Sequence, residues 1–127
     1  MSINVPLAEL AQAIEAHPFA YLLTVSEEKR VHAVAVDAAV DGDRLRVPRL
    51  GRRTLTNSEQ QPAVTLLWPP AQTGGYSLIV DGTAERSDDG VLVTPSRAVL
   101  HRAAAGSGEQ VDDGEACGSD CVELPTH

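Results

Sequence analysis

Short apolar segments separated by turns constrain the fold of this 127-residue chain more than any other feature. The connections between most of them are too short for the crossovers that parallel strands require. Aromatic residues make up only 3% of the chain, so Val, Leu, Ile and Ala must build the core, and β-branched residues favour strands. We therefore predict an antiparallel meander that closes into a barrel. Its six strands are expected over residues 19–26, 31–40, 44–49, 63–68, 76–85 and 91–102.

Two helices are predicted beside these strands. Apolar residues recur at helical spacing over residues 6–16, and His17-Pro18 ends this helix because the residue before proline avoids the α region. Gly51 breaks the third strand, and residues 52–60 are predicted as a short helix between strands three and four. With only these two helices beside six strands, the predicted fold is mainly β.

The second predicted strand has apolar residues on both of its faces. Val31, Ala33 and Ala35 alternate with His32, Val34 and Val36. A strand that is buried on both sides fits a barrel wall that something else covers. We therefore expect a second copy of the chain to cover it, which makes the protein a homodimer.

The net charge of -8 is unevenly distributed along the chain. Six acidic residues and no Lys or Arg follow Arg102, which predicts a barrel domain over residues 1–102 and an acidic tail over 103–127. The acidity argues against nucleic acid as a partner. No segment has the pattern of a signal peptide, and no apolar run is long enough to span a membrane. We expect a cytoplasmic protein without a membrane partner.

Five of the ten Lys and Arg residues lie within ten positions, between Arg44 and Arg53. In the middle of this cluster a glycine follows a strand and a helix begins. A helix start offers unpaired backbone N–H groups and the positive end of the helix dipole, which together favour an anion. Arginines in a first turn oppose that dipole unless a phosphate neutralises them, and their planar fork suits phosphate oxygens. The predicted anion site comprises Arg49, Arg52, Arg53, Thr54 and Asn57.

A plainer interpretation of the same arginines remains open. Arg52 and Arg53 could be exposed to solvent and paired with acids such as Glu27 or Glu59. In that case the segment would carry no ligand.

The order of these segments resembles the pyridoxamine-phosphate-oxidase-like flavin-binding proteins. That family has a Leu-Gly-Ser-Arg-Lys-like segment opening a short helix, which Leu50-Gly51-Arg52-Arg53-Thr54 resembles. Its flanking strands are similar to residues 20–25, 31–36, 63–68 and 80–85 of this chain. The resemblance covers residues 19–102 and implies a six-stranded antiparallel split β-barrel with an N-terminal helix and one short helix between strands three and four.

The resemblance also implies a function and a cofactor. In the family the Arg and Lys of the helix-opening segment bind the flavin phosphate; Arg53 matches the Arg, Thr54 replaces the Lys and Arg52 replaces the Ser. The chain is thus expected to bind FMN and to transfer hydride between the flavin and a small molecule. Ala33 and Ala38 stand where the oxidase itself carries Arg and Lys, so pyridoxamine phosphate is not the expected substrate.

Alternatives of the same fold remain. A deazaflavin coenzyme has a long phosphate-lactyl-glutamyl tail that needs a wide basic groove, which the five arginines between Arg44 and Arg53 could supply. A non-catalytic barrel could bind flavin or haem without turnover. No Ser-His-Asp or Cys-His arrangement identifies catalytic residues. Trp68 is a candidate neighbour of the cofactor, as are Tyr76 and His101.

Cys117 and Cys121 are the only two cysteines. Two thiols four residues apart could supply half of a metal site, a small-loop disulfide or a redox pair. A complete zinc site needs four ligands, and only His127 or a second chain could add one nearby. The simplest interpretation is a pair of free thiols, and we predict no metal site.

Overall fold

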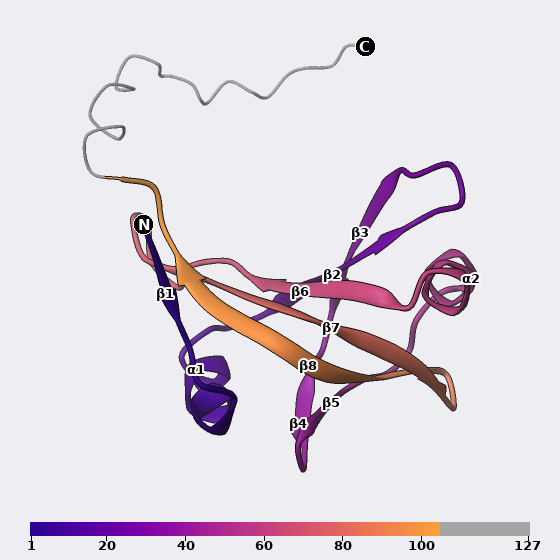
Figure 1. Ribbon diagram of the computed structural model, residues 1–127, viewed down its shortest axis with the longest axis horizontal. Helices are drawn as coiled ribbons and strands as arrows, with labels where there is room; N and C mark the ends of the chain where they lie inside the picture. The colour runs from indigo at the N-terminus through magenta and orange to yellow at the C-terminus, as the bar shows by residue number, and fades with distance from the viewer. Residues whose placement is uncertain (105–127) are drawn as a thin grey trace.

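The computed structural model describes residues 1–104 and confirms the mainly β fold. One antiparallel sheet curls into a split barrel that does not close (Figure 1). The strand order is β3-β2-β6-β7-β8-β5-β4, and β1 pairs with β8 outside this path. The strands are β1 (Ser2–Asn4), β2 (Ala20–Val25), β3 (Val31–Val36), β4 (Ala39–Asp41), β5 (Arg44–Val47), β6 (Ala63–Trp68), β7 (Ser77–Ser87) and β8 (Gly90–His101).

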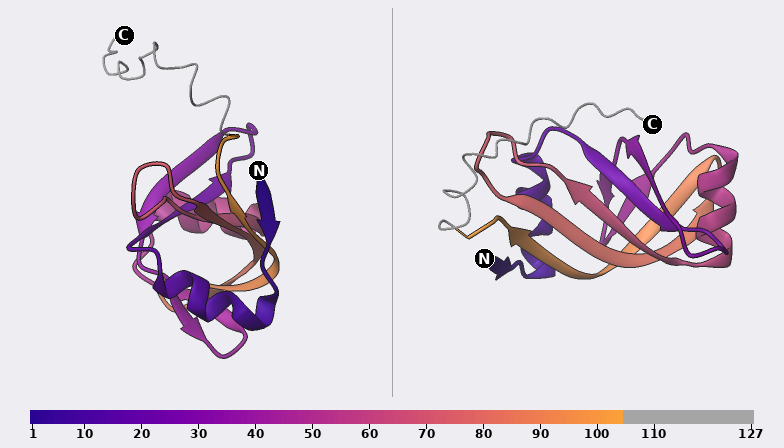
Figure 2. Two further views of the ribbon diagram at one scale, coloured as in Figure 1. Left: turned by 90° about the vertical axis from the view of Figure 1, so that its left-hand side faces the viewer. Right: turned by 90° about the horizontal axis from the view of Figure 1, so that it is seen from above.

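The helices lie at opposite ends of the barrel, as Figures 1 and 2 show. A 3-10 turn at Leu7–Glu9 leads into α1 (Leu10–Glu15) at one end. At the other end lies α2 (Arg52–Gln60), whose bounds match the predicted short helix. No helix within residues 1–104 combines the length and the apolar character needed to cross a membrane.

The core is aliphatic, as the composition requires. Along β2, β5 and β6 every second side chain is buried, because successive side chains of a strand point to opposite faces. Trp68 is the one large aromatic residue in this core and is 2% exposed. The side chains with less than 2% exposure include Leu22, Leu45, Leu66, Leu78, Val47, Val80, Val91 and Val93.

Two short strands were not expected from the sequence. The predicted strand over residues 31–40 is divided, since β3 ends at Val36 and β4 begins at Ala39. The N-terminal β1 adds to the far half of β8. The acidic tail with Cys117 and Cys121 begins where the barrel ends, and from residue 105 onward it lies outside the described residues.

The expectation that both faces of β3 are buried was wrong within a single chain. Val31, Ala33 and Ala35 are exposed, and Val31 retains 67% of its accessible surface. The reason is topological, because β3 lies at the end of the strand order with β2 as its only neighbour. Its inward face is half-buried against the barrel, while its outward face is covered by nothing in the described chain.

Two glycines allow β8 to make its close contacts. At the register shift between Asp81 and Gly82, a Cβ on Gly82 would stand 2.6 Å from the carbonyl oxygen of Thr94. At Gly90, where β8 begins, a Cβ would overlap the carbonyl oxygen of Val47 and the backbone of Pro48. These approaches let β8 pair with β7 along its whole length and with β5 over its first half.

We predict that Gly90→Ala lowers the free energy of unfolding by about 1–3 kcal/mol, because the added methyl group forces β5 and β8 apart. Gly51→Ala is the matched control, since a Cβ at Gly51 meets nothing within 4 Å. Urea denaturation of both variants measures the difference. Equal stability of the two variants would contradict the close β5–β8 contact.

Candidate functional site

The predicted anion site lies where α2 begins, beyond the end of β5 (Figure 1). Gly51 is the residue that caps the helix, in an extended conformation and without a side-chain hydrogen bond to the first turn. The first turn holds Arg52 and Arg53 and no acidic residue. The free N–H groups of this turn therefore have neither a capping side chain nor a carboxylate to satisfy them.

Arg52 and Arg53 are exposed, and neither forms a salt bridge within residues 1–104. Glu59, one of the acids considered as their partner, instead pairs with Arg86 at 3.0 Å. Two arginine side chains thus stand at the positive end of a helix dipole without a counter-ion in the described part of the chain. This arrangement is suited to an anionic ligand.

The other three arginines of the cluster do have partners. Arg44 pairs with Glu85 at 3.5 Å and Arg46 with Asp41 at 2.6 Å. Arg49 pairs with Asp37 at 2.5 Å. Within residues 1–104, the cluster therefore consists of two arginines without a salt bridge and three arginines that each pair with an acid.

A short segment fixes the direction in which α2 begins. Arg49 has a positive φ of 59°, a left-handed conformation that is uncommon for residues other than glycine. Its backbone N–H donates to the Asp89 Oδ1 at 3.1 Å, and the Leu50 N–H donates to the Asp89 carbonyl oxygen at 2.9 Å. The β7–β8 turn thus holds the chain just before Gly51.

Thr54 and Asn57 are not displayed beside the arginines. They lie on the inward face of α2, where Thr54 is 2% and Asn57 4% exposed. The Asn57 Nδ2 donates to the Oγ1 of Thr24 on β2 at 3.1 Å, and Thr24 is fully buried. This buried hydrogen bond ties the helix to the sheet beneath it. Sequence reasoning missed Thr24, because its partner Asn57 is 33 positions away along the chain.

The structure does not bring the three aromatic candidates to this site. Trp68 lies in the core at the end of β6 that is remote from α2, opposite Leu78. The Tyr76 ring lies 4.5 Å from the guanidinium of Arg102, and His101 hydrogen-bonds the Ser2 hydroxyl at 3.0 Å. Both residues are at the far end of the barrel.

A hollow of about 250 Å³ lies beside the segment that follows β5, and its lining reaches Arg49, two residues before Gly51. Arg49 and Asp37 lie on its rim, and Phe19 is 46% exposed beside it. Sequence reasoning missed Asp37 as a site residue, although a lone acid directly after a doubly apolar strand was a usable signal. The residues that line the hollow are Phe19, Ala35, Val36, Asp37, Pro48 and Arg49.

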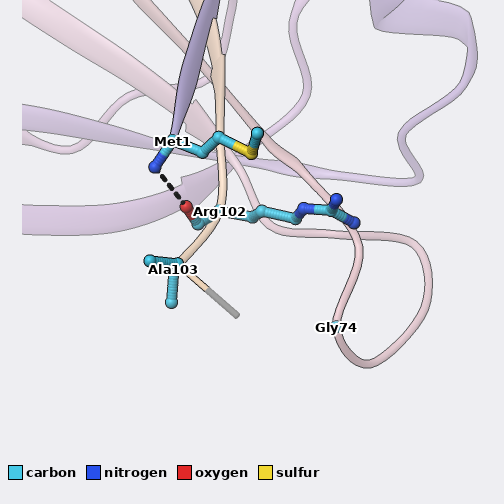
Figure 3. A pocket seen from close by; sticks show the side chains of 5 residues that line it. Met1, Gly74, Arg102 and Ala103 are labelled. Atoms are coloured by element: carbon cyan, nitrogen blue, oxygen red, sulfur yellow. Dashed lines mark hydrogen bonds between the residues drawn. The ribbon is translucent and has the colours of Figure 1, made fainter. Parts of the chain in front are cut away.

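A larger hollow, about 650 Å³, lies at the opposite end of the barrel. Figure 3 shows Met1 and Arg102 there, with the Met1 amino group bonded to the Arg102 carbonyl oxygen at 2.9 Å. Its lining also includes Gly74, Ala103 and Ala104. Size alone would favour this hollow, but it contains none of the clustered arginines and no helix start.

Comparison with known proteins identifies the class of protein. The pyridoxamine 5'-phosphate oxidase family model matches residues 7–115. The chain belongs to this family. It is 44% identical to the Mycobacterium bovis protein Mb0449c over 135 residues, which covers 94% of each chain.

Solved structures show the same fold at lower identity. An F420 reductase superimposes with a TM-score of 0.60 at 20% identity, covering 74% of this chain and 98% of its own. An FMN-binding protein from Syntrophomonas wolfei also gives 0.60, at 11% identity, covering 77% of this chain and 87% of its own. These two structures show that the chain shares its fold with an F420 reductase and with an FMN-binding protein.

We predict that Thr24→Val destabilises the protein by about 1–3 kcal/mol, because it leaves the buried Asn57 amide without an acceptor. In an Asn57→Ala background the same change should cost clearly less. Urea denaturation of the four proteins in this double-mutant cycle measures the coupling. Fully additive effects would show that the two side chains do not depend on each other.

Proposed function

We propose that this protein binds a flavin-type cofactor through the start of α2 and transfers hydride between that cofactor and a small molecule. The observation that carries the proposal is the pair of exposed arginines, Arg52 and Arg53, in a first turn that has no capping side chain and no acid. Membership of the pyridoxamine 5'-phosphate oxidase family supports it.

The residues at the site fit a phosphate group. Arginine donates two parallel hydrogen bonds to phosphate oxygens, and backbone N–H groups at a helix start add donors along the dipole. Arg53, in the first turn, and Arg52 beside it would hold the phosphate. Thr54 and Asn57, which are buried beneath the same helix, would hold the helix in place rather than contact the ligand.

The flavin ring supplies the redox chemistry when it is bound, and the protein supplies binding, orientation and local polarity. The hollow beside Arg49 would hold the small-molecule substrate next to the flavin ring. Its Phe19 and Pro48 walls are apolar, so they would exclude water from one side of a planar ring. Ala33 and Ala38 carry no charge at the positions where the oxidase has Arg and Lys. We therefore do not propose pyridoxamine phosphate as the substrate.

FMN is the cofactor we propose first, and a deazaflavin coenzyme is the second candidate. The similarity to an F420 reductase favours the second. The pairing of the arginines favours the first, because Arg44 and Arg46 are engaged by Glu85 and Asp41. A long polyanionic tail would need those arginines, whereas one phosphate needs only Arg52 and Arg53.

We further propose that two copies of the chain associate through the outward face of β2 and β3. By alternation with the buried Ala20, Leu22 and Thr24, the other side chains of β2 point outward. They lie opposite the exposed apolar residues of β3 and form one continuous apolar surface, and such surfaces mark interaction sites. Its cross-strand pairs are Tyr21 with Ala35, Leu23 with Ala33 and Val25 with Val31.

Arg53→Ala should weaken FMN binding by about tenfold or more, because it removes a charge-assisted hydrogen bond to phosphate. Titration of FMN fluorescence measures this affinity. Arg102→Ala is the control, since it removes the same charge from the larger hollow at the other end of the barrel. If Arg102→Ala weakens binding and Arg53→Ala does not, the cofactor site is assigned to the wrong end.

Titrations with FMN and with the deazaflavin coenzyme, followed by absorbance, should show tighter binding of FMN. A reductant and an electron acceptor added to the loaded protein then test for turnover. Binding of FMN without any turnover would indicate that the protein carries the cofactor and is not an oxidoreductase. Tighter binding of the deazaflavin would reverse the order of the two candidates.

The wild-type protein should sediment at about twice the 13.4 kDa of one chain. Ala33→Glu should convert it to a monomer, because the substitution places an unpaired charge in the proposed interface. Val40→Glu is the control, since Val40 is 46% exposed on β4, away from that face. A monomeric wild type, or a dimer that tolerates Ala33→Glu, would contradict this interface.

A further inference from the structure

An ion pair between Arg49 and Asp37 spans the rim of the hollow beside α2. Both side chains are well exposed, 65% for Arg49 and 81% for Asp37, so each remains accessible to a ligand. The rest of the lining is apolar. The hollow therefore combines apolar walls with one positive and one negative group whose charges cancel.

The backbone of Arg49 is fixed beside the hollow. It is held in a left-handed conformation by the two hydrogen bonds to Asp89, one from the Arg49 N–H and one from that of Leu50. A residue held in an uncommon backbone conformation often serves a site. Only Leu50 separates Arg49, which lines the hollow, from Gly51, which caps α2.

We propose that Asp37 is a specificity-determining residue that makes the hollow select uncharged ligand groups over anionic ones. The Asp37 carboxylate is ion-paired with the Arg49 guanidinium. An anionic ligand group would therefore have to displace this carboxylate to bind Arg49. An uncharged planar group can contact the apolar side chains of the hollow and leave the ion pair intact. This inference deepens the proposed function, because the hollow would hold the small-molecule substrate, which we assign to the uncharged class.

The nearest comparison within the chain is the ion pair of Asp41 with Arg46. It has the same two residue types, its arginine also lies on the β5 segment, and its N–O distance is 2.6 Å. Neither residue lines the hollow. Asp41→Asn therefore removes the same negative charge from the same part of the barrel without changing the rim.

Benzoate and benzamide test the proposal, because they share a planar ring and differ in charge. Binding of each is measured by ligand-observed NMR on the wild-type protein and on Asp37→Asn and Asp41→Asn. We expect Asp37→Asn to raise the benzoate affinity by about threefold to fivefold, the upper part of the range for an exposed ion pair. Benzamide affinity should stay within about twofold in all three proteins, and benzoate should not respond to Asp41→Asn. Adding Arg49→Gln to Asp37→Asn should abolish the gain.

Three results would overturn the proposal. They are an equal gain for both Asp→Asn variants, an equal gain for both ligands, and no binding of either ligand to any variant. FMN titrations of the same proteins report separately on the cofactor site. If FMN fails to bind while Asp37→Asn still gains benzoate affinity, the proposed function fails and the role of Asp37 stands. If FMN binds and benzoate affinity does not change, the proposed cofactor site stands and the role of Asp37 fails.

Discussion

The bend of β8 over Gly82 is the constraint on which the other features depend. At that bend Asp81 pairs with Arg97 and Gly82 with Pro95, so one extra residue lies on the β8 side. The bend lets a single 12-residue strand pair with β5 in its first half and with β1 in its second half, while β7 follows it throughout. The same strand thereby brings the end of β5, and with it the start of α2, to one end of the barrel.

The site combines a rigid base with an exposed charged surface. Beneath α2, the buried bond between Asn57 and Thr24 joins the helix to the sheet. Above it, Arg52 and Arg53 carry charge that the described chain does not neutralise. Buried polar groups position a helix well only when they are hydrogen-bonded, whereas an anion site needs donors that are still free. The inward face of the nine-residue helix α2 carries the hydrogen-bonded polar groups, and its outward face carries the free donors.

Much of this fold could be predicted from the sequence because its turns and apolar alternation are local signals. The bounds of α2 and of β6 match the predicted ranges. The exposure of the outward face of β3 was not predictable, since an edge strand and a central one can have the same apolar composition. The pairing of Arg49 with Asp37 was equally hidden, because it depends on how the segments that follow β3 and β5 are placed in space. The remote position of Trp68 followed from strand direction, which residue type does not reveal.

The central claim is that the start of α2 holds the phosphate of the cofactor. A crystal structure of the protein with FMN tests it most directly, because the phosphate is located independently of any effect on stability. The account predicts phosphate oxygens within hydrogen-bonding distance of the Arg53 guanidinium and of the first-turn N–H groups. A phosphate bound instead in the hollow between Met1 and Arg102, at the other end of the barrel, would contradict it.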